Sequence, residues 1–251
     1  MKITIITVCF NSESTIEDTI NSIQNQDYHD IEYIVIDGGS TDNTLEIIKK
    51  NSSIVSKLIS EPDKGIYDAM NKGLAMATGE ITAIINSDDF YKNNHAISTV
   101  VKAFEQNVSI VYADIEYIDK TDHKKVVRYW KSGKFEKKKM KYGWMPPHPA
   151  FFVRTQVYKT YGFFNTQLKI SADYELMLRL LYKHSLSVFY LNETLVSMRI
   201  GGVGNKSLKN RIRANKEDKL AWKINGLDYS FLTTILKPIR KIPQFIFKKN
   251  A

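Results

Sequence analysis

The first ninety residues alternate apolar, β-branched stretches with helical patterns, and this alternation constrains the fold more than any other feature of the sequence. Buried strands are predicted over residues 2–10, 31–37, 56–60 and 80–89. Helices are predicted between them, over residues 12–26, around Leu45 to Ile48, and over residues 65–79. Strands and helices in strict succession imply a parallel sheet with right-handed crossovers.

The pattern changes after Asp89. A helix around Ile97 to Phe104 is followed by two predicted antiparallel strands, over residues 109–119 and 124–130. A basic, Pro-rich loop over residues 131–149 then leads to a further strand over residues 150–154. Residues 172–183 predict a strongly apolar helix, and residues 187–202 predict strands around a turn. The chain is therefore expected to be an α/β protein whose second part includes antiparallel strands.

Length and composition fit one large domain, with or without an appendage. The chain has 251 residues, of which 43% are hydrophobic. No stretch approaches the roughly 20 apolar residues that span a bilayer, and the N-terminus becomes polar too soon for a secretory signal, so we expect a cytoplasmic protein. The single cysteine, Cys9, rules out an intramolecular disulfide framework and is expected to pack in a buried strand.

The net charge of +9 is concentrated at the C-terminus. Residues 206–251 contain 12 Lys/Arg and 3 Asp/Glu, whereas residues 1–205 contain 24 of each kind. The same segment interleaves basic residues with apolar ones and is interrupted by Pro238 and Pro243. From residue 231 onward its apolar residues include Phe231, Leu232, Ile235, Leu236, Ile239, Ile242, Phe245, Ile246 and Phe247. Two interpretations stay open: a surface for an anionic bilayer, or a C-terminal helix packed on the domain with a solvated basic face.

Polar side chains follow each of the four predicted parallel strands. These are Asn11, Asp37, the segment from Glu61 to Lys64, and the adjacent pair Asp88 and Asp89. Ligands of an open parallel sheet bind at the carboxyl ends of its strands, so these groups are expected to share one site. Asp42, by contrast, is expected to be only a turn or cap residue.

A nucleotide diphosphate with a divalent cation would explain this set of residues. Mg²⁺ or Mn²⁺ takes one or two carboxylates from a protein and completes its shell with phosphate and water. We expect Asp89 to hold the metal, and Asp88 and Asp37 to accept hydrogen bonds from the ribose or the base. The alternative is that Asp88 and Asp89 only cap the helix that begins near Asn93.

The motifs at these strand ends resemble those of family 2 glycosyltransferases with the GT-A fold, especially small bacterial enzymes of O-antigen, capsule or exopolysaccharide synthesis. The matching segments are TVCFNSESTIEDTINSIQNQ, EYIVIDGGSTDNT, SEPDKGIYDAMNKGLAMATGE, INSDD, PPHPAFFVR and ISADYELMLR. The resemblance covers roughly residues 1–205. It implies a Rossmann-like, mostly parallel sheet flanked by helices, with residues 1–90 binding the nucleotide, residues 91–205 binding the acceptor, and residues 206–251 as a basic extension.

The resemblance also implies roles for individual residues. Asp173, at the start of a helix, matches the family's catalytic base, and Asp89 lies in the metal-binding motif. Donor-binding residues are expected to be Thr7, Asn11, Asp37, Glu61, Lys64, Asp68, Asn71, Asp88, His148 and Arg179. Glu175 is a rival base, but it lies about 200° around the helix from Asp173, so only one of the two can face the site. Arg179 is suited to bind phosphate or to pair with Glu175.

Two positions depart from the family pattern, and two tryptophans are candidates for sugar stacking. Asn86 stands where many relatives have Asp, and Met70 stands where many have a phosphate-binding Arg, a charge that Lys64 is expected to replace. Trp130 and Trp144 flank the basic loop and are expected either to stack on a sugar or to pack in the core.

The expected function is metal-dependent, inverting transfer of a hexose from a nucleotide diphosphate sugar, most simply UDP-linked, to a saccharide acceptor. The acceptor is expected to be lipid-linked, on the inner face of the membrane, and a homodimer is left open. A sugar-phosphate nucleotidyltransferase is the nearest alternative, but it would want a Gly-rich first turn, which the sequence lacks. A dehydrogenase would need a similar turn, and nucleic-acid binding gives no reason for the Asp pair.

Overall fold

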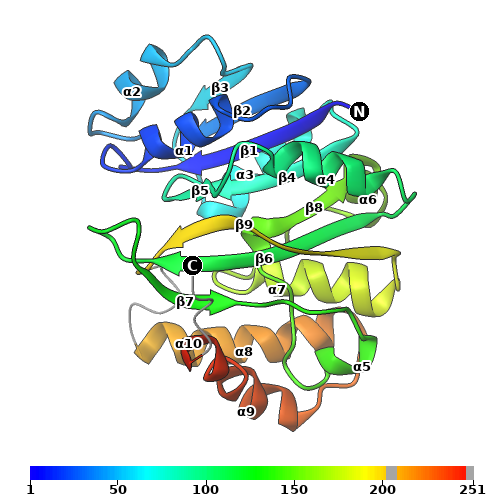
Figure 1. The fold of residues 1–251 in the computed structure, drawn as a ribbon. Coiled ribbons are helices and arrows are strands. Elements are labelled where there is room, and N and C mark those ends of the chain that lie inside the picture. Colours follow the sequence, from blue (N-terminus) through cyan, green and yellow to red (C-terminus); the bar gives the residue numbers. More distant parts are fainter. Residues whose placement is uncertain (202–207, 247–251) are drawn as a thin grey trace.

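The computed structural model describes residues 1–201 and 208–246, and its centre is a nine-stranded mixed sheet (Figure 1). The strand order is β3-β2-β1-β4-β8-β6-β9-β5, with β7 paired to β6. The strands are β1 Ile3–Cys9, β2 Ile31–Asp37, β3 Lys57–Ser60, β4 Ile81–Asn86, β5 Asp89–Tyr91, β6 Ile110–Ile118, β7 Val126–Trp130, β8 Phe151–Arg154 and β9 Val188–Arg199. The predicted α/β fold class is confirmed.

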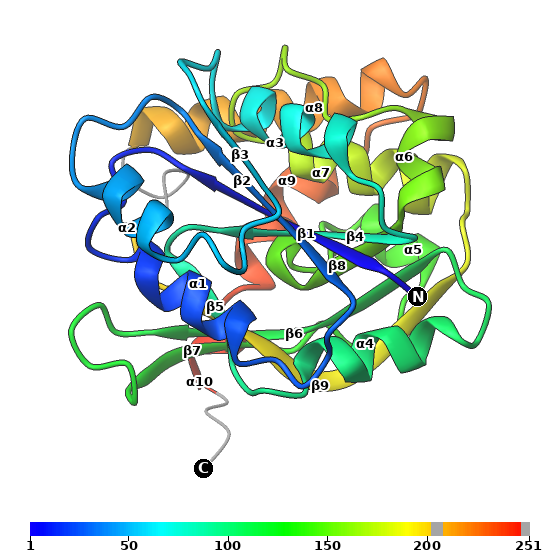
Figure 2. The same ribbon diagram turned by 90° about the horizontal axis from the view of Figure 1, so that it is seen from above.

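Helices cover both faces of the sheet (Figure 2). One face packs against α1 Ile16–Gln24, α2 Thr44–Lys50 and α4 Ala96–Phe104. The other packs against α3 Ile66–Met76, α6 Thr155–Tyr161 and α7 Ala172–Met177, which continues as a π-helix over Leu178–Lys183. Alternate residues of β1 enter the two cores: Ile6 and Val8 enter one, whereas Ile3, Ile5 and Cys9 enter the other. Strands buried on both faces explain the apolar runs of the sequence.

The strands β1–β4 pair only in parallel with one another, as the strict alternation of the sequence predicts. In register, Cys9 lies beside Asp37, Asp37 beside Ser60, and Val8 beside Asn86. The carboxyl ends of the four strands therefore meet at one edge. This edge is the place where ligands of open α/β sheets bind.

The second part of the sheet is mixed, because β8 runs antiparallel to both β4 and β6 while β9 runs parallel to β6. The predicted antiparallel pair β6 and β7 is present. The predicted turn within residues 187–202 is not, since β9 runs unbroken from Val188 to Arg199 with register shifts against β6. The predicted loop over residues 131–149 contains one short helix, α5 Lys137–Met140, and leads into a 3₁₀ turn over His148–Ala150.

The C-terminal extension folds onto the domain as α8 Leu208–Ile224, α9 Phe231–Ile239 and α10 Pro243–Ile246. Trp222 of α8 is fully buried and donates its indole N–H to the Tyr174 hydroxyl, 2.8 Å away. The helix α8 thus packs on the domain through Trp222, while its basic residues Lys216, Lys219 and Lys223 are exposed. Some expectations for the tail fall outside the described residues. They concern the predicted boundary at residues 205 and 206, the residue Phe247, and the side chains of Leu232, Ile235 and Ile246.

Glu32 links the parallel strands to the end of α3 at the opposite edge of the sheet from the strand ends. It is 4% exposed, and its carboxylate accepts hydrogen bonds from the Thr4 hydroxyl, the Lys57 ammonium, and the backbone and hydroxyl of Thr78. Burial alone would raise the pKa of Glu32, but these hydrogen bonds outweigh burial and lower it to about 2. The ionised carboxylate therefore stabilises the fold.

We predict that Glu32 makes the protein acid-sensitive. Because its folded pKa is about 2 and its ordinary value is 4.5, its contribution is complete above pH 4.5 and is lost as the pH falls toward 2. The contribution amounts to about 3 kcal/mol at neutral pH. Urea unfolding of wild type and Glu32→Gln between pH 7 and pH 3 measures it. If the free energy of unfolding of Glu32→Gln fell with decreasing pH as steeply as that of wild type, the prediction would be contradicted.

Candidate active site

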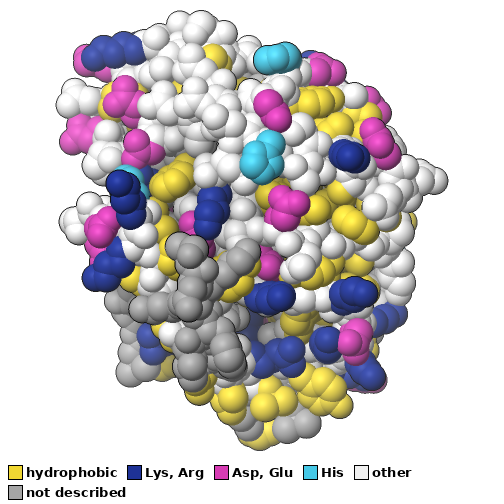
Figure 3. Space-filling view, in the orientation of Figure 1, with side chains coloured by type: hydrophobic (Ala, Val, Ile, Leu, Met, Phe, Trp, Pro, Cys, Tyr) yellow, Lys and Arg dark blue, Asp and Glu magenta, His cyan; other side chains and the backbone are white. Residues whose placement is uncertain are grey.

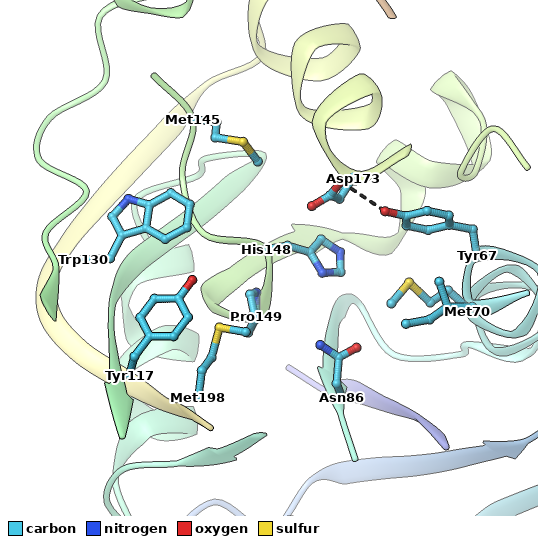
Figure 4. A pocket seen from close by; sticks show the side chains of 11 residues that line it. Tyr67, Met70, Asn86, Tyr117, Trp130, Met145, His148, Pro149, Asp173 and Met198 are labelled. Atoms are coloured by element: carbon cyan, nitrogen blue, oxygen red, sulfur yellow. Dashed lines mark hydrogen bonds between the residues drawn. The ribbon is translucent and has the colours of Figure 1, made fainter. Parts of the chain in front are cut away.

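A cavity of about 200 Å³ lies at the carboxyl end of β4, between α3 and the start of α7 (Figure 4). Side chains from both halves of the chain line it: Ile66, Tyr67, Met70, Asn86, Tyr117, Trp130, Met145, His148, Pro149, Asp173 and Met198. Aromatic and sulfur-containing side chains form one wall, and Asp173 and His148 face the interior. The cavity thus combines an apolar wall with a few convergent polar groups, as ligand sites do.

Asp173 is the carboxylate that faces the cavity. It lies in the first turn of α7, partly exposed, and its Oδ1 atom is 3.1 Å from the Tyr67 hydroxyl, which also lies 2.8 Å from the Ile170 carbonyl. The rival Glu175 points away: it is buried, pairs with Arg179 at 3.0 Å and accepts a hydrogen bond from Asn225. As the helix geometry predicts, only one of the two carboxylates, that of Asp173, lines the cavity.

His148 lies beside Asp173 in the cavity wall. Its ring packs edge-on against Phe164, with 5.5 Å between the ring centroids. Burial lowers the pKa of His148 below its ordinary value of 6.5, and the negative charge of Asp173 opposes this effect only in part. The imidazole is therefore neutral at pH 7 and can both donate and accept a hydrogen bond.

The carboxylate pair occupies a sharp turn rather than a helix cap. Asp89 begins β5, and the next helix, α4, starts only at Ala96 with His95 at its N-cap. The capping interpretation of Asp88 and Asp89 is therefore excluded. Asp89 is fully buried, whereas Asp88 is partly exposed in the turn between β4 and β5.

The groups around Asp89 fit a cation. Burial and the neighbouring charge of Asp88 raise the pKa of Asp89 well above its ordinary value, against opposing effects of Asn86 and Arg199. In the described part of the chain, Asp89 Oδ1 and Asn86 Oδ1 are buried without a hydrogen-bond partner, although the Asn86 amide donates to Asp89 Oδ2 at 3.1 Å. Buried oxygens of this kind call for a donor or a metal ion.

A cation here would need ligands from elsewhere. Within residues 1–201 and 208–246, no cluster of three or more His, Cys, Asp or Glu side chains could hold a metal on its own. The buried oxygens of Asp89 and Asn86 suit Mg²⁺ or Mn²⁺, because these ions take few carboxylates and fill the remaining positions with phosphate and water.

Arg199 supports the same turn and was not singled out from the sequence. Its guanidinium donates to the Asp88 carbonyl at 2.8 Å, forms an ion pair with Asp18 of α1, and lies over the Phe90 ring. Arg199 is the last residue of β9, so the final strand of the second half fixes the position of the turn that carries the carboxylates.

The polar residues at the ends of β1 and β2 are held by the protein itself. The Thr7 hydroxyl lies 3.1 Å from Tyr33, and Asn11, in a left-handed conformation, accepts a hydrogen bond from the Thr41 backbone. Asp37 is fully buried and binds the Ser40 backbone and hydroxyl, the Gly39 backbone and the Ser60 hydroxyl. Asp37 therefore shapes the turn after β2, in which Gly39 has a φ of 83°.

The predicted donor residues between β3 and α3 have structural partners as well. Glu61 pairs with Lys72 at 2.7 Å, and Asp68 accepts a hydrogen bond from the Lys64 backbone at the start of α3. Asn71 exchanges two hydrogen bonds with the backbone of Phe164 and so joins the two halves of the chain. Of this group, Glu61 and Lys64 are exposed.

Arg179, Trp144 and Asp42 lie away from the cavity. Arg179 donates to Glu175 and to the carbonyls of Tyr161 and Phe163, so its guanidinium is fully occupied and is not placed to bind a donor phosphate. Trp144 is buried and donates to the Ser132 carbonyl, which assigns it to the core; Trp130, in contrast, lines the cavity. Asp42 accepts from Thr44 and Glu13, as expected of a turn residue.

A family model for glycosyl transferase family 2 matches residues 4–162, more than half of the chain. The chain belongs to this family. A PGL/p-HBAD biosynthesis glycosyltransferase from Mycobacterium bovis is 27% identical over 207 residues, covering 80% of this chain and 78% of the relative. The protein is therefore a glycosyltransferase.

Solved structures of low sequence identity share the fold. S. aureus TarS 1–349 in complex with UDP-GlcNAc has a TM-score of 0.68 at 17% identity, covering 90% of this glycosyltransferase and 65% of that chain. The mannosyltransferase PcManGT from Pyrobaculum calidifontis, in complex with GDP-Man and Mn²⁺, has a TM-score of 0.66 at 18% identity, covering 96% and 69%. The chain spans 41% of the longer TarS structure. The fold is the GT-A fold.

Two further residues position the glycosyltransferase's cavity and escaped the sequence analysis. Tyr67 contacts Asp173, as described above. Glu217 of α8 accepts hydrogen bonds from the backbone N–H groups of Lys169, Ile170 and Ser171, at 2.7 to 3.0 Å, immediately before α7. Burial would raise the pKa of Glu217, but these bonds and Arg213 lower it. Because Glu217 lies 44 residues after Asp173 in a polar, basic helix, no local pattern indicates this contact.

We predict that Glu217→Ala lowers the free energy of unfolding by about 2 to 3 kcal/mol, because three backbone N–H groups, of which that of Ser171 is buried, lose a charged acceptor. Glu217→Gln keeps an acceptor oxygen and should cost less. Urea unfolding measures both variants.

Glu193→Ala is the matched control for this experiment, because Glu193 is exposed on β9. Substitution there should change the free energy of unfolding by less than about 0.5 kcal/mol. Equal effects at Glu217 and Glu193 would show that the contact before α7 contributes nothing.

Proposed function

We propose that the protein is a metal-dependent, inverting hexosyltransferase that uses a UDP-sugar and transfers the hexose to a saccharide acceptor. The observation that carries this proposal is the arrangement around one cavity. Asp173 and His148 from the second half face Asn86, the last residue of β4, which immediately precedes the carboxylate turn.

The donor is proposed to lie across the aligned ends of β1–β4. Asp89, with Asp88 beside it, would hold Mn²⁺ or Mg²⁺, and the bound ion would supply positive charge to the departing diphosphate. At the end of β1, the Phe10 ring is 61% exposed and offers a stacking face for the base. Complexes of the related folds with UDP-GlcNAc and with GDP-Man and Mn²⁺ support a nucleotide-sugar donor.

Asp173 is proposed as the general base. It faces the cavity from the first turn of α7. The Tyr67 hydroxyl fixes one of its oxygens and leaves the other for the acceptor hydroxyl. The apolar wall containing Trp130 and Tyr117 gives the acceptor sugar a surface on which to stack.

The acceptor is proposed to be a lipid-linked saccharide at the inner face of the membrane, in the synthesis of a surface polysaccharide such as O-antigen or capsule. None of the described helices is long and apolar enough to cross a bilayer. Homodimerisation stays a prediction. Family membership favours glycosyl transfer over nucleotidyl transfer, the alternative considered from the sequence.

We predict that Asp89→Asn weakens UDP binding in the presence of Mn²⁺ by at least about tenfold, because the cation loses its protein ligand. Titration calorimetry with UDP, GDP and dTDP, each with Mn²⁺ and with EDTA, measures the effect and shows which nucleotide the protein binds. Asp30→Asn, at an exposed site, is the control and should bind as wild type. Wild-type affinity in Asp89→Asn would remove Asp89 from the metal site.

We predict that Asp173→Asn leaves UDP affinity unchanged but lowers turnover about 100-fold or more, because the amide cannot accept the proton of the acceptor. Release of UDP from UDP-sugar with a supplied acceptor measures turnover. Turnover within a few fold of wild type would exclude Asp173 as the base.

A further inference from the structure

The helix α8 presents an unusual pair of faces. Its inward face carries the acids Glu217 and Asp218 together with Ala221 and Trp222, all buried against the domain. Its outward face carries a mixed stripe at spacings of three and four residues: Ile212, Lys216, Lys219, Leu220, Lys223 and Ile224. An ordinary surface helix buries its apolar side chains and exposes its acids, so this arrangement calls for a partner on the outward side.

Exposed apolar side chains concentrate in the C-terminal extension. Among the described residues, twelve large hydrophobic side chains are exposed, and seven of them lie within residues 208–246: Ile212, Leu220, Ile224, Phe231, Ile239, Ile242 and Phe245. Phe231 is the most exposed, at 74%. Figure 3 shows hydrophobic and basic side chains together at this end of the molecule. A concentration of this kind marks an interaction surface.

An open groove of about 480 Å³ runs beside the stripe. Lys216, Lys219 and Lys223 line it together with Leu220, Leu227 and Tyr229, and Asp228 is the single acid among its lining residues. Among residues 1–201 and 208–246, none of these three lysines forms an ion pair, whereas nearby Lys237 is neutralised by Asp218 at 2.6 Å. The groove therefore has uncompensated positive charge above an apolar floor.

We propose that the outward face of α8, with this groove, binds the phosphate headgroups of acidic phospholipids. Phosphate complements the three lysines, and the exposed isoleucines and phenylalanines would enter the boundary between headgroups and acyl chains. Nucleic acid would also complement the lysines, but it would leave the exposed apolar side chains without a partner. The inference refines the proposed membrane location and does not depend on the donor, the metal or the base.

The test is sedimentation of the full-length protein with vesicles of phosphatidylcholine, with and without phosphatidylglycerol. Wild type should bind only the acidic vesicles, and added salt should weaken the binding. The triple variant Lys216→Gln, Lys219→Gln, Lys223→Gln should lose at least about tenfold in affinity, since each lysine near an acidic surface contributes to binding. Phe231→Ser should also weaken it.

The matched control changes three exposed lysines on the opposite face of the sheet, Lys49, Lys50 and Lys102. This variant should bind acidic vesicles as wild type does. Three results would overturn the proposal. Wild type would fail to bind acidic vesicles, the two triple variants would bind equally, or wild type would bind both vesicle types equally. UDP titration of the same samples separates the lipid-binding proposal from the proposed function. A protein that binds UDP but not acidic vesicles would overturn only the lipid-binding proposal.

Discussion

The structure depends on the parallel pairing of β1 between β2 and β4, buried on both faces. Helices on either side cover the pairing, so strands rich in isoleucine and valine exclude water and fix their register. The register places Cys9, Asp37 and Asn86 at one edge. Every polar group proposed to act on the donor lies at this edge or in a loop that leaves it.

The second half adds what the parallel half lacks. Asp173 and His148 reach the edge from α7 and from the turn before β8, and the paired hydrogen bonds of Asn71 to Phe164 hold the two halves together. Arg199 connects the last strand to the carboxylate turn. The site is thus assembled across the junction of two halves, and each half contributes groups that the other positions.

Local patterns predicted most of the fold. Apolar runs and helical spacing located β1–β4 and their helices, because a strand buried on both faces appears in the sequence as a continuous run of apolar residues. The single strand β9 was predicted as two strands around a turn, since the polar residues Asn192 and Glu193 interrupt its apolar pattern while backbone pairing to β6 carries the strand through them.

The site was predicted in part, for a physical reason. Asp173 and His148 do face the cavity, as their motifs suggested. Arg179, Asp68 and Asn71 form hydrogen bonds with the backbone or other side chains, and sequence alone does not distinguish a polar group that serves a ligand from one that serves the fold. Tyr67, Arg199 and Glu217 act through contacts between distant segments, which no local spacing reveals.

The contact of Glu217 with the backbone before α7 ties the geometry of the cavity to the C-terminal extension. The family model ends at residue 162, so it includes the carboxylate turn but neither Asp173 nor its support from α8. The start of α7, which carries Asp173, therefore depends on a helix that lies well beyond the matched segment. A change in how α8 packs would move Asp173 within the cavity and leave the carboxyl ends of β1–β4 in place.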